Sequence, residues 1–223
     1  MIETSDAAIV AFTLRTALIS TALVVPIGLA IAWLLGRFEW RGKALVETLV
    51  LLPLVMPPVA TGLILLKLFS RRAAFGHLLD RWGIEIVFTW RAVVAAMVVM
   101  SLPLFVRAAR VALEEVNVRY ESVARTLGAS EPRVFFSITL PLASRGILGG
   151  TVLAFARAIG EFGATIVVAG NIPGRTTTMA LAIFDRVQLG KDSEAYRLVA
   201  ICAVIAFAAL WINEAVIRRR PAR

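Results

Sequence analysis

The chain has 223 residues, of which 59% are hydrophobic and only 17% charged, and its mean hydropathy is +0.83. This composition is typical of an integral membrane protein and excludes an ordinary soluble domain. One cysteine, Cys202, and one histidine, His77, exclude an intrachain disulfide and argue against a metal site or a Ser/His or Cys/His catalytic set. Basic loops between apolar runs explain the net charge of +9, so we expect no nucleic-acid partner.

Five stretches contain the roughly 20 mostly apolar residues that a membrane-crossing helix needs. They are residues 8–36, 44–69, 87–112, 138–169 and 195–217. The first carries Arg15 near one end, from which a long side chain can reach the membrane interface. Two mixed segments, 70–86 and 176–197, are predicted to be interfacial or partly re-entrant. We therefore predict an all-α membrane protein with five transmembrane helices in a single domain, residues 1–223.

The second stretch contains three prolines, Pro53, Pro57 and Pro58. Proline removes a backbone donor and breaks or kinks a helix. A broken helix is tolerated in lipid only where it faces protein or a hydrated cavity. Two interpretations stay open, a kink that fits a neighbouring helix and a translocation path lined by Pro57 and Pro58.

The longest interval that does not suit a membrane runs from 113 to 141. Its apolar residues recur at helical spacing and form one stripe, Tyr120, Val123, Ala124 and Leu127. Asn117 suits the N-cap of this helix, and Gly128 suits the left-handed position after its end. Ser130 is then expected to cap a second helix, with Pro132 in its first turn. The sequence predicts a short helix, a glycine hinge and a second helix start beside the bilayer.

The fourth stretch combines ionisable residues with glycines. Arg157 and Glu161 are one helical turn apart and share a face. They form either a self-neutralising pair inside the bundle or part of a pathway, because ionisable groups at membrane depth usually face a cavity. Gly160 and Gly163 allow a bend or a close approach beside them. We favour the pathway, and expect all four residues to lie next to it.

The basic residues predict the topology. Five spans place the loop 37–43, the stretch 113–137 and the C-terminus on one side, and that side carries the larger share of arginine and lysine. By the positive-inside rule it faces the cytoplasm, with Met1 outside.

The spacing from Gly128 to Pro141 resembles a known motif. Nine residues separate Gly128 from Ile138-x-Leu140-Pro141, as in the EAA loop of permease subunits of bacterial ABC importers. Ala124 also matches, whereas the first two positions of the triplet are Ser122 and Val123, with Glu121 displaced by one. In that family the loop is a cytoplasmic coupling helix that docks on the ATPase subunit. An ordinary interfacial amphipathic helix is the alternative. The resemblance implies that the ATPase-coupling residues are Tyr120, Glu121, Ala124, Leu127 and Gly128, within a coupling loop at 113–137.

Nearly the whole chain resembles the permease subunit of bacterial molybdate ABC importers, with the type I ABC importer permease fold. The runs that carry the resemblance lie at 52–58, 124–128, 133–136, 157–164 and 171–174. It implies a homodimer in the lipid of the inner membrane, a cytoplasmic ABC ATPase and an extracytoplasmic molybdate-binding protein, working by alternating access. The expected cargo is molybdate, with tungstate as a mimic. Sulfate importers have a similar G-E-F-G run, so a permease for sulfate, thiosulfate or another oxyanion is the alternative.

The energy for transport is expected to come from another polypeptide. No G-x-x-x-x-G-K-[ST] motif occurs, because Gly190-Lys191 is followed by Asp192. We therefore expect no catalytic residue, no metal and no cofactor in this chain, and ATP with Mg²⁺ on the partner. A membrane-embedded enzyme would need clustered nucleophiles or metal ligands, and an ion channel would not need a docking loop.

Overall fold

The computed structural model describes residues 5–218, and every regular element in that range is helical. In chain order the helices are α1 (Asp6–Arg37), α2 (Lys43–Val55), α3 (Pro58–Phe69), α4 (Ala74–Arg81), α5 (Trp90–Glu114), α6 (Val118–Thr126), α7 (Glu131–Val134), the π-helix η1 (Phe135–Thr139), α8 (Leu140–Ile159), α9 (Gly163–Val168), α10 (Met179–Gln188) and α11 (Asp192–Arg218). The prediction of an all-α protein is confirmed. Met1 and the basic residues 219–223, used to predict the topology, lie outside the described residues.

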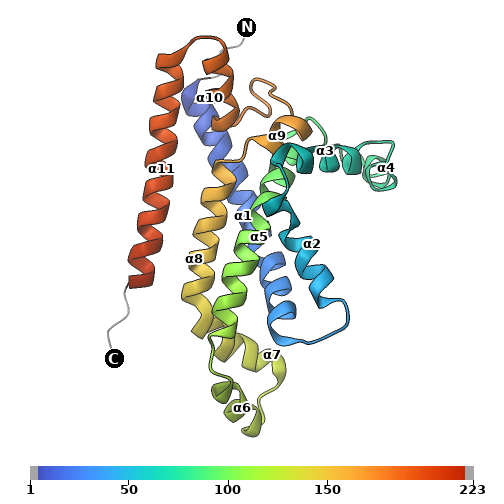
Figure 1. Ribbon diagram of the computed structural model, residues 1–223, viewed down its shortest axis with the longest axis vertical. Coiled ribbons are helices and arrows are strands. Elements are labelled where there is room, and N and C mark those ends of the chain that lie inside the picture. Colours follow the sequence, from blue (N-terminus) through green and yellow to red (C-terminus); the bar gives the residue numbers. More distant parts are fainter. Residues whose placement is uncertain (1–4, 219–223) are drawn as a thin grey trace.

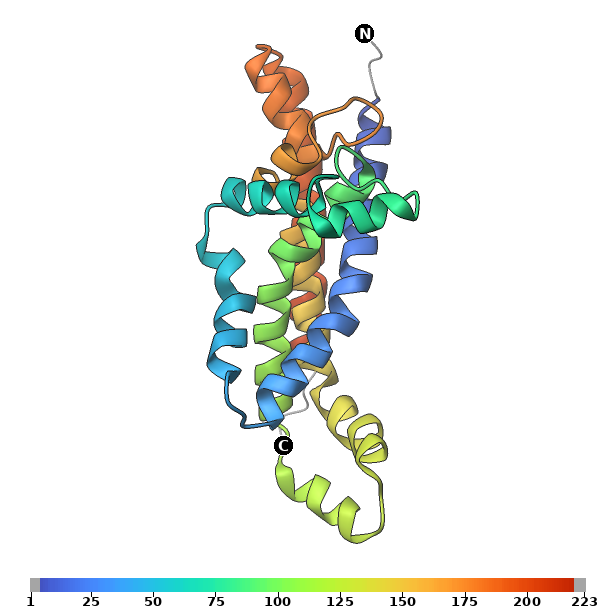
Figure 2. The same cartoon turned by 90° about the vertical axis from the view of Figure 1, so that its right-hand side faces the viewer.

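Helices α1, α5 and α8 run side by side and form the centre of the bundle (Figures 1 and 2). Small residues bring α8 close to α5. A Cβ atom on Gly146 would lie 2.5 Å from the Cβ of Ala112, and one on Gly150 would lie 2.9 Å from the Cβ of Ala108. Helices in membranes commonly associate through such small-residue faces, because the backbones then approach closely. These three helices therefore form a tightly packed unit.

Four continuous helical segments are long and apolar enough to cross a membrane: α1, α5, α11 and the segment from Glu131 to Ile159. The remaining predicted span, residues 44–69, is broken. Its halves, α2 and α3, are bent by 116° where the chain reaches Pro57, so the prolines act as the sequence predicts. The prediction of five spans holds when this bent pair is counted as one.

The ends of the bundle differ in character (Figure 1). Helices α6 and α7 project from one end, and α4 and α10 lie at the other. The segment 176–197, expected to be interfacial or partly re-entrant, contains α10, which contacts α1 and is followed by α11. The Thr13 hydroxyl of α1 accepts a hydrogen bond from the backbone N–H of Met179 (2.9 Å) and ties α10 to the bundle.

Candidate functional site

The first candidate site is the coupling segment, residues 113–137, which extends beyond the bundle as α6 and α7 (Figures 1 and 2). Its local structure is the predicted one. Asn117 caps α6, since its side-chain oxygen accepts a hydrogen bond from the N–H of Arg119 (2.9 Å). Gly128 has a φ of +85°, the left-handed conformation that favours glycine. Ser130 stands at the N-cap of α7 without making a side-chain cap bond.

An apolar stripe on α6 is exposed in the single chain. Tyr120 and Val123 are each more than half exposed, and Leu127 at the tip of the segment is 82% exposed. Ala124 is half-buried on the same stripe. Exposed apolar patches of this kind mark interaction sites, because water leaves them when a partner binds.

Glu121 differs from its neighbours on α6 because it is buried, with 2% of its surface exposed. Its carboxylate pairs with Arg37 at the end of α1 and accepts a hydrogen bond from the hydroxyl of Thr139 in η1 (2.7 Å). Of the five residues predicted to couple to the ATPase, this one alone points inward. Its position is that of an anchor between α6, α1 and η1. A buried carboxylate with these partners is satisfied, and losing one partner is costly.

A second ion pair braces the tip of the segment. The guanidinium of Arg125 donates to both carboxylate oxygens of Glu131, at 2.6 and 3.1 Å, across the turn at Gly128. The hydrogen bond from Arg125 lowers the pKa of Glu131, and the same bond raises the pKa of Arg125. The pair therefore stays ionised at neutral pH and fixes α6 relative to α7.

The second candidate site is the α3–α9 junction, where the second half of the broken span packs against the short helix that follows α8. A Cβ atom on Gly163 would lie 2.7 Å from the Cβ of Pro58, and one on Gly62 would lie 2.7 Å from the carbonyl oxygen of Ala164. The predicted path residues Pro58 and Gly163 are thus brought together from distant parts of the sequence. Pro57 precedes α3 as its N-cap residue and is exposed in the single chain.

Arg157 and Glu161 form an ion pair beside this junction, at 2.8 Å between Nη1 and Oε2. Glu161 is 1% exposed, and its other oxygen accepts a hydrogen bond from the N–H of Ala164 (2.7 Å), which caps the start of α9. The side chain of Arg157 is 29% exposed. The pair therefore spans the break at Gly160, with the acid buried and the base partly open.

Two hydroxyl groups at the junction have no partner. The Oγ1 atoms of Thr61 on α3 and Thr165 on α9 are buried and make no hydrogen bond among the residues that the structure describes. Buried polar groups usually have a hydrogen-bond partner, so these two hydroxyl groups can still form hydrogen bonds.

The two sites lie at different levels of the bundle, and α8 connects them. The sequence does not identify Arg37 and Thr139 as the residues that hold Glu121. Arg37 is 84 positions from Glu121, and only its place at the end of an apolar helix distinguishes it in the sequence.

Comparisons with known proteins agree with this arrangement. A family model described as "binding-protein-dependent transport system inner membrane component" matches residues 25–220. The molybdenum transport system permease protein ModB of Escherichia coli (strain K12) is 48% identical over 207 residues, covering 92% of this chain and 90% of that protein. The sulfate transport system permease protein CysT of the same strain is 38% identical over 176 residues, covering 79% of this chain and 64% of that protein.

A solved structure shows the same fold. A chain from the inward-facing MetNI methionine ABC transporter superimposes with a TM-score of 0.74 at 16% identity, covering 96% of this chain and 98% of that chain. The predicted type I ABC importer permease fold is therefore confirmed.

Proposed function

Because the chain belongs to the family of inner membrane components of binding-protein-dependent transport systems, we propose that it is the permease subunit of an ATP-driven importer of molybdate. Tungstate, a close mimic of molybdate, is the expected second cargo. The observation that carries this proposal is the higher identity and fuller coverage with a molybdenum permease than with a sulfate permease. The chain acts as one transmembrane domain over residues 1–223.

The proposed assembly contains two copies of this chain in the lipid of the inner membrane, an ABC ATPase in the cytoplasm and a molybdate-binding protein outside. The exposed stripe on α6 supports docking of the ATPase, with Tyr120, Ala124 and Leu127 as contacts and Gly128 as the turn that presents them. ATP and Mg²⁺ belong to that partner, and the chain itself catalyses no reaction.

Glu121 transmits the movement of the ATPase in this proposal. The ion pair with Arg37 joins α6 to α1, and the hydrogen bond from Thr139 joins it to η1 and so to α8. A displacement of α6 therefore moves two central helices together, because both are held by one buried carboxylate. Alternating access follows if these helices open one end of the path as they close the other.

The α3–α9 junction is proposed as the wall of the translocation path, with Pro57, Pro58, Arg157, Gly160, Glu161 and Gly163 beside it. A tetrahedral dianion does not enter hydrocarbon without hydrogen-bond donors. The partly exposed guanidinium of Arg157 and the unpaired hydroxyls of Thr61 and Thr165 support a donor-lined route here. The buried Glu161 keeps Arg157 in place and reduces its net attraction, so the anion passes without being trapped.

The orientation is also part of the proposal. The end of the bundle that carries the coupling segment faces the cytoplasm, with the C-terminus on the same side and the N-terminus outside. Arg37, Arg119, Arg125 and Arg133 at that end support this, since cytoplasmic loops are enriched in basic residues.

Uptake measurements test the cargo. Labelled molybdate, tungstate and sulfate are supplied to a strain whose only oxyanion importer contains this chain with its native partners. We expect molybdate and tungstate to accumulate and to compete with each other. Sulfate uptake that excess molybdate does not reduce would favour the alternative, a permease for sulfate or thiosulfate.

A further inference from the structure

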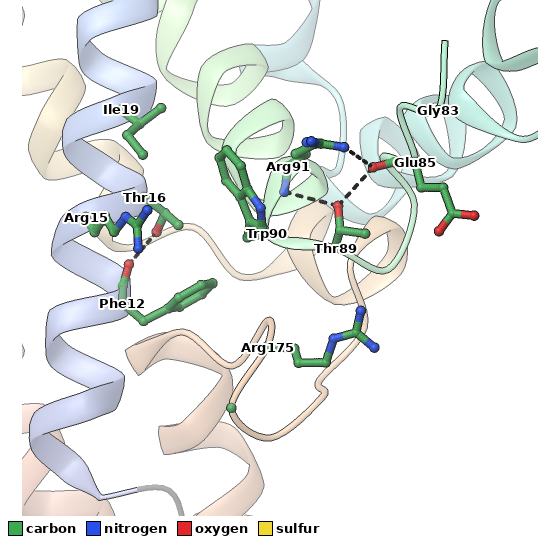
Figure 3. A pocket seen from close by; sticks show the side chains of 11 residues that line it. Phe12, Arg15, Thr16, Ile19, Gly83, Glu85, Thr89, Trp90, Arg91 and Arg175 are labelled. Carbon is green, nitrogen blue, oxygen red and sulfur yellow. Dashed lines mark hydrogen bonds between the residues drawn. The ribbon is translucent and has the colours of Figure 1, made fainter. Parts of the chain in front are cut away.

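A pocket of about 580 Å³ lies at the end of the bundle opposite the coupling segment (Figure 3). It is bounded by α1, by the start of α5 and by the loop that contains Gly174. Three arginines from distant parts of the chain line it, namely Arg15, Arg91 and Arg175. Within residues 5–218 none of the three forms an ion pair with a carboxylate. We call this the arginine pocket.

Among the described residues, the one acidic side chain that lines the pocket already has a cationic partner. The carboxylate of Glu85 pairs with Arg71, which lies outside the pocket and also contacts Asp80 at 3.2 Å. Figure 3 shows this carboxylate turned away from Arg91, and Glu85 offers Arg91 only its backbone oxygen, at 3.2 Å. The pocket therefore keeps three guanidinium groups without a counter-charge from its own walls.

The neighbouring hydroxyl groups are neutral, and their hydrogens already take part in hydrogen bonds. Thr16 donates to backbone oxygens of its own helix, and Thr89 donates to the backbone oxygen of Ile86 (2.6 Å). The ring of Trp90 lies 5.7 Å from the guanidinium carbon of Arg91, which holds that side chain in place. Among the described side chains that line the pocket, the charged donors are those of the three arginines, of which Arg91 already makes one hydrogen bond to the backbone oxygen of Glu85.

The position of these charges also needs a reason. Arg15 lies within the membrane-spanning helix α1, and ionisable groups at membrane depth usually face a cavity or a pathway. Arg91, at the start of α5, and Arg175, in the loop after α9, line the same pocket. Guanidinium groups bind tetrahedral oxyanions through two parallel hydrogen bonds, which gives both charge and geometry to the contact.

Resting on the proposed function, we propose that the arginine pocket binds the transported tetrahedral dianion on the outer face of the permease. It receives molybdate as the binding protein opens and raises the local concentration of the anion above the α3–α9 junction. A phospholipid headgroup offers the same tetrahedral chemistry, so the test must distinguish a free anion from a lipid phosphate.

The test measures equilibrium binding of labelled molybdate to the complete permease–ATPase complex in nanodiscs, without the binding protein. The pocket variant combines Arg15→Gln, Arg91→Gln and Arg175→Gln. The matched control combines Arg72→Gln, Arg81→Gln and Arg197→Gln, which remove the same charge at the same end of the bundle from residues that do not line the pocket. Each arginine lost from a charge-assisted contact should weaken binding about tenfold. We expect saturable binding to the wild type and the control, and none to the pocket variant.

A second pocket variant, which combines Arg15→Lys, Arg91→Lys and Arg175→Lys, shows whether lost binding reflects lost folding. It keeps the positive charges and should therefore keep part of the molybdate binding. Failure of the wild-type complex to bind molybdate, or equal binding by the pocket and control variants, would overturn the proposal. Phospholipid that co-purifies with the wild type but not with the pocket variant, without molybdate binding, would assign the pocket to lipid and overturn it as well. Uptake by the wild type with its binding protein and ATP is measured in parallel, so failure of the proposed function is recognised separately.

Discussion

Replacing Glu121 with alanine tests whether one buried carboxylate anchors the coupling segment. The side chain is 3% exposed, and that of its partner Arg37 is 21% exposed. Removing one member of a fully buried ion pair costs about 3–5 kcal/mol, and the partial exposure of Arg37 lowers this because water can solvate the guanidinium that remains. The hydroxyl of Thr139 also loses its acceptor. We expect the local stability of α6 to fall by about 2 kcal/mol.

Two measurements report this change. Hydrogen exchange of peptides within 113–137, in the assembled transporter, should become faster by about thirtyfold, the equivalent of that free energy. The ratio of molybdate transported to ATP hydrolysed should fall, because the ATPase then moves a helix that is no longer fixed to α1 and η1. Glu115→Ala is the control, since Glu115 is an exposed carboxylate at the start of the same segment.

The variant Arg37→Ala should reproduce the phenotype of Glu121→Ala. If the two residues act through one contact, the double variant should be no worse than the more severe single variant. Additive effects, or a Glu121→Ala protein with wild-type exchange and a wild-type transport ratio, would refute the anchor.

The remaining predictions concern the surface of the coupling segment, its turn and the junction. Leu127→Glu should abolish association with the ATPase in a pull-down while leaving the protein in the membrane. Leu189→Glu, at the other end of the bundle, should not, although Leu189 is also more than half exposed. Gly128→Val should impair transport because a β-branched residue at φ +85° costs roughly 1–2 kcal/mol, whereas Gly128→Asn should retain it, since asparagine tolerates the left-handed conformation. A Cβ atom there would meet no other atom within 4 Å, so space does not limit either variant at that atom. Gly163→Val should abolish uptake by clashing with Pro58, while Gly160→Ala, whose Cβ would meet nothing closer than 3.9 Å, should be tolerated. Because Arg125 lowers the pKa of Glu131, the contribution of their pair is present above the ordinary pKa of a glutamate and is lost as pH falls through the lowered value. The protection of amides at the α6–α7 turn, measured relative to their intrinsic exchange rate at each pH, should thus be constant in the wild type from neutral pH down to that range, and lower over the same interval in Glu131→Gln.

Local patterns in the sequence account for much of the fold. The apolar runs predict the spans, Asn117 and Gly128 predict the two ends of α6, and the prolines predict the break before α3. Each of these depends on residues within a few positions of one another. The structure of segment 176–197 is harder to predict, because its mixed composition suits an interfacial segment as well as a helix. Its place on α1 depends on the hydroxyl of Thr13, far away in the sequence.

In the candidate sites, too, the sequence predicts local features but does not predict tertiary contacts. The stripe on α6 is visible as a periodicity, and the pair Arg157–Glu161 as a spacing, because both lie within single helical turns. The burial of Glu121 is not visible, since an acidic residue on an amphipathic helix is normally solvated. Only the tertiary contact with Arg37 and Thr139 turns this carboxylate inward.

Helix α8 explains how the two sites can act together. Thr139, which donates to Glu121, directly precedes α8, and Arg157 lies two residues before its other end. Its 20 residues span about 30 Å, the thickness of the hydrocarbon core. Gly150 packs closely on α5, and we expect α8 to move as a rigid body, so that movement of α6 reaches the junction. Glu121→Ala interrupts this route before α8, whereas Gly163→Val acts beyond it. Both should lose transport, but only the first should loosen the coupling segment, and faster exchange at 113–137 in Gly163→Val would contradict the rigid link.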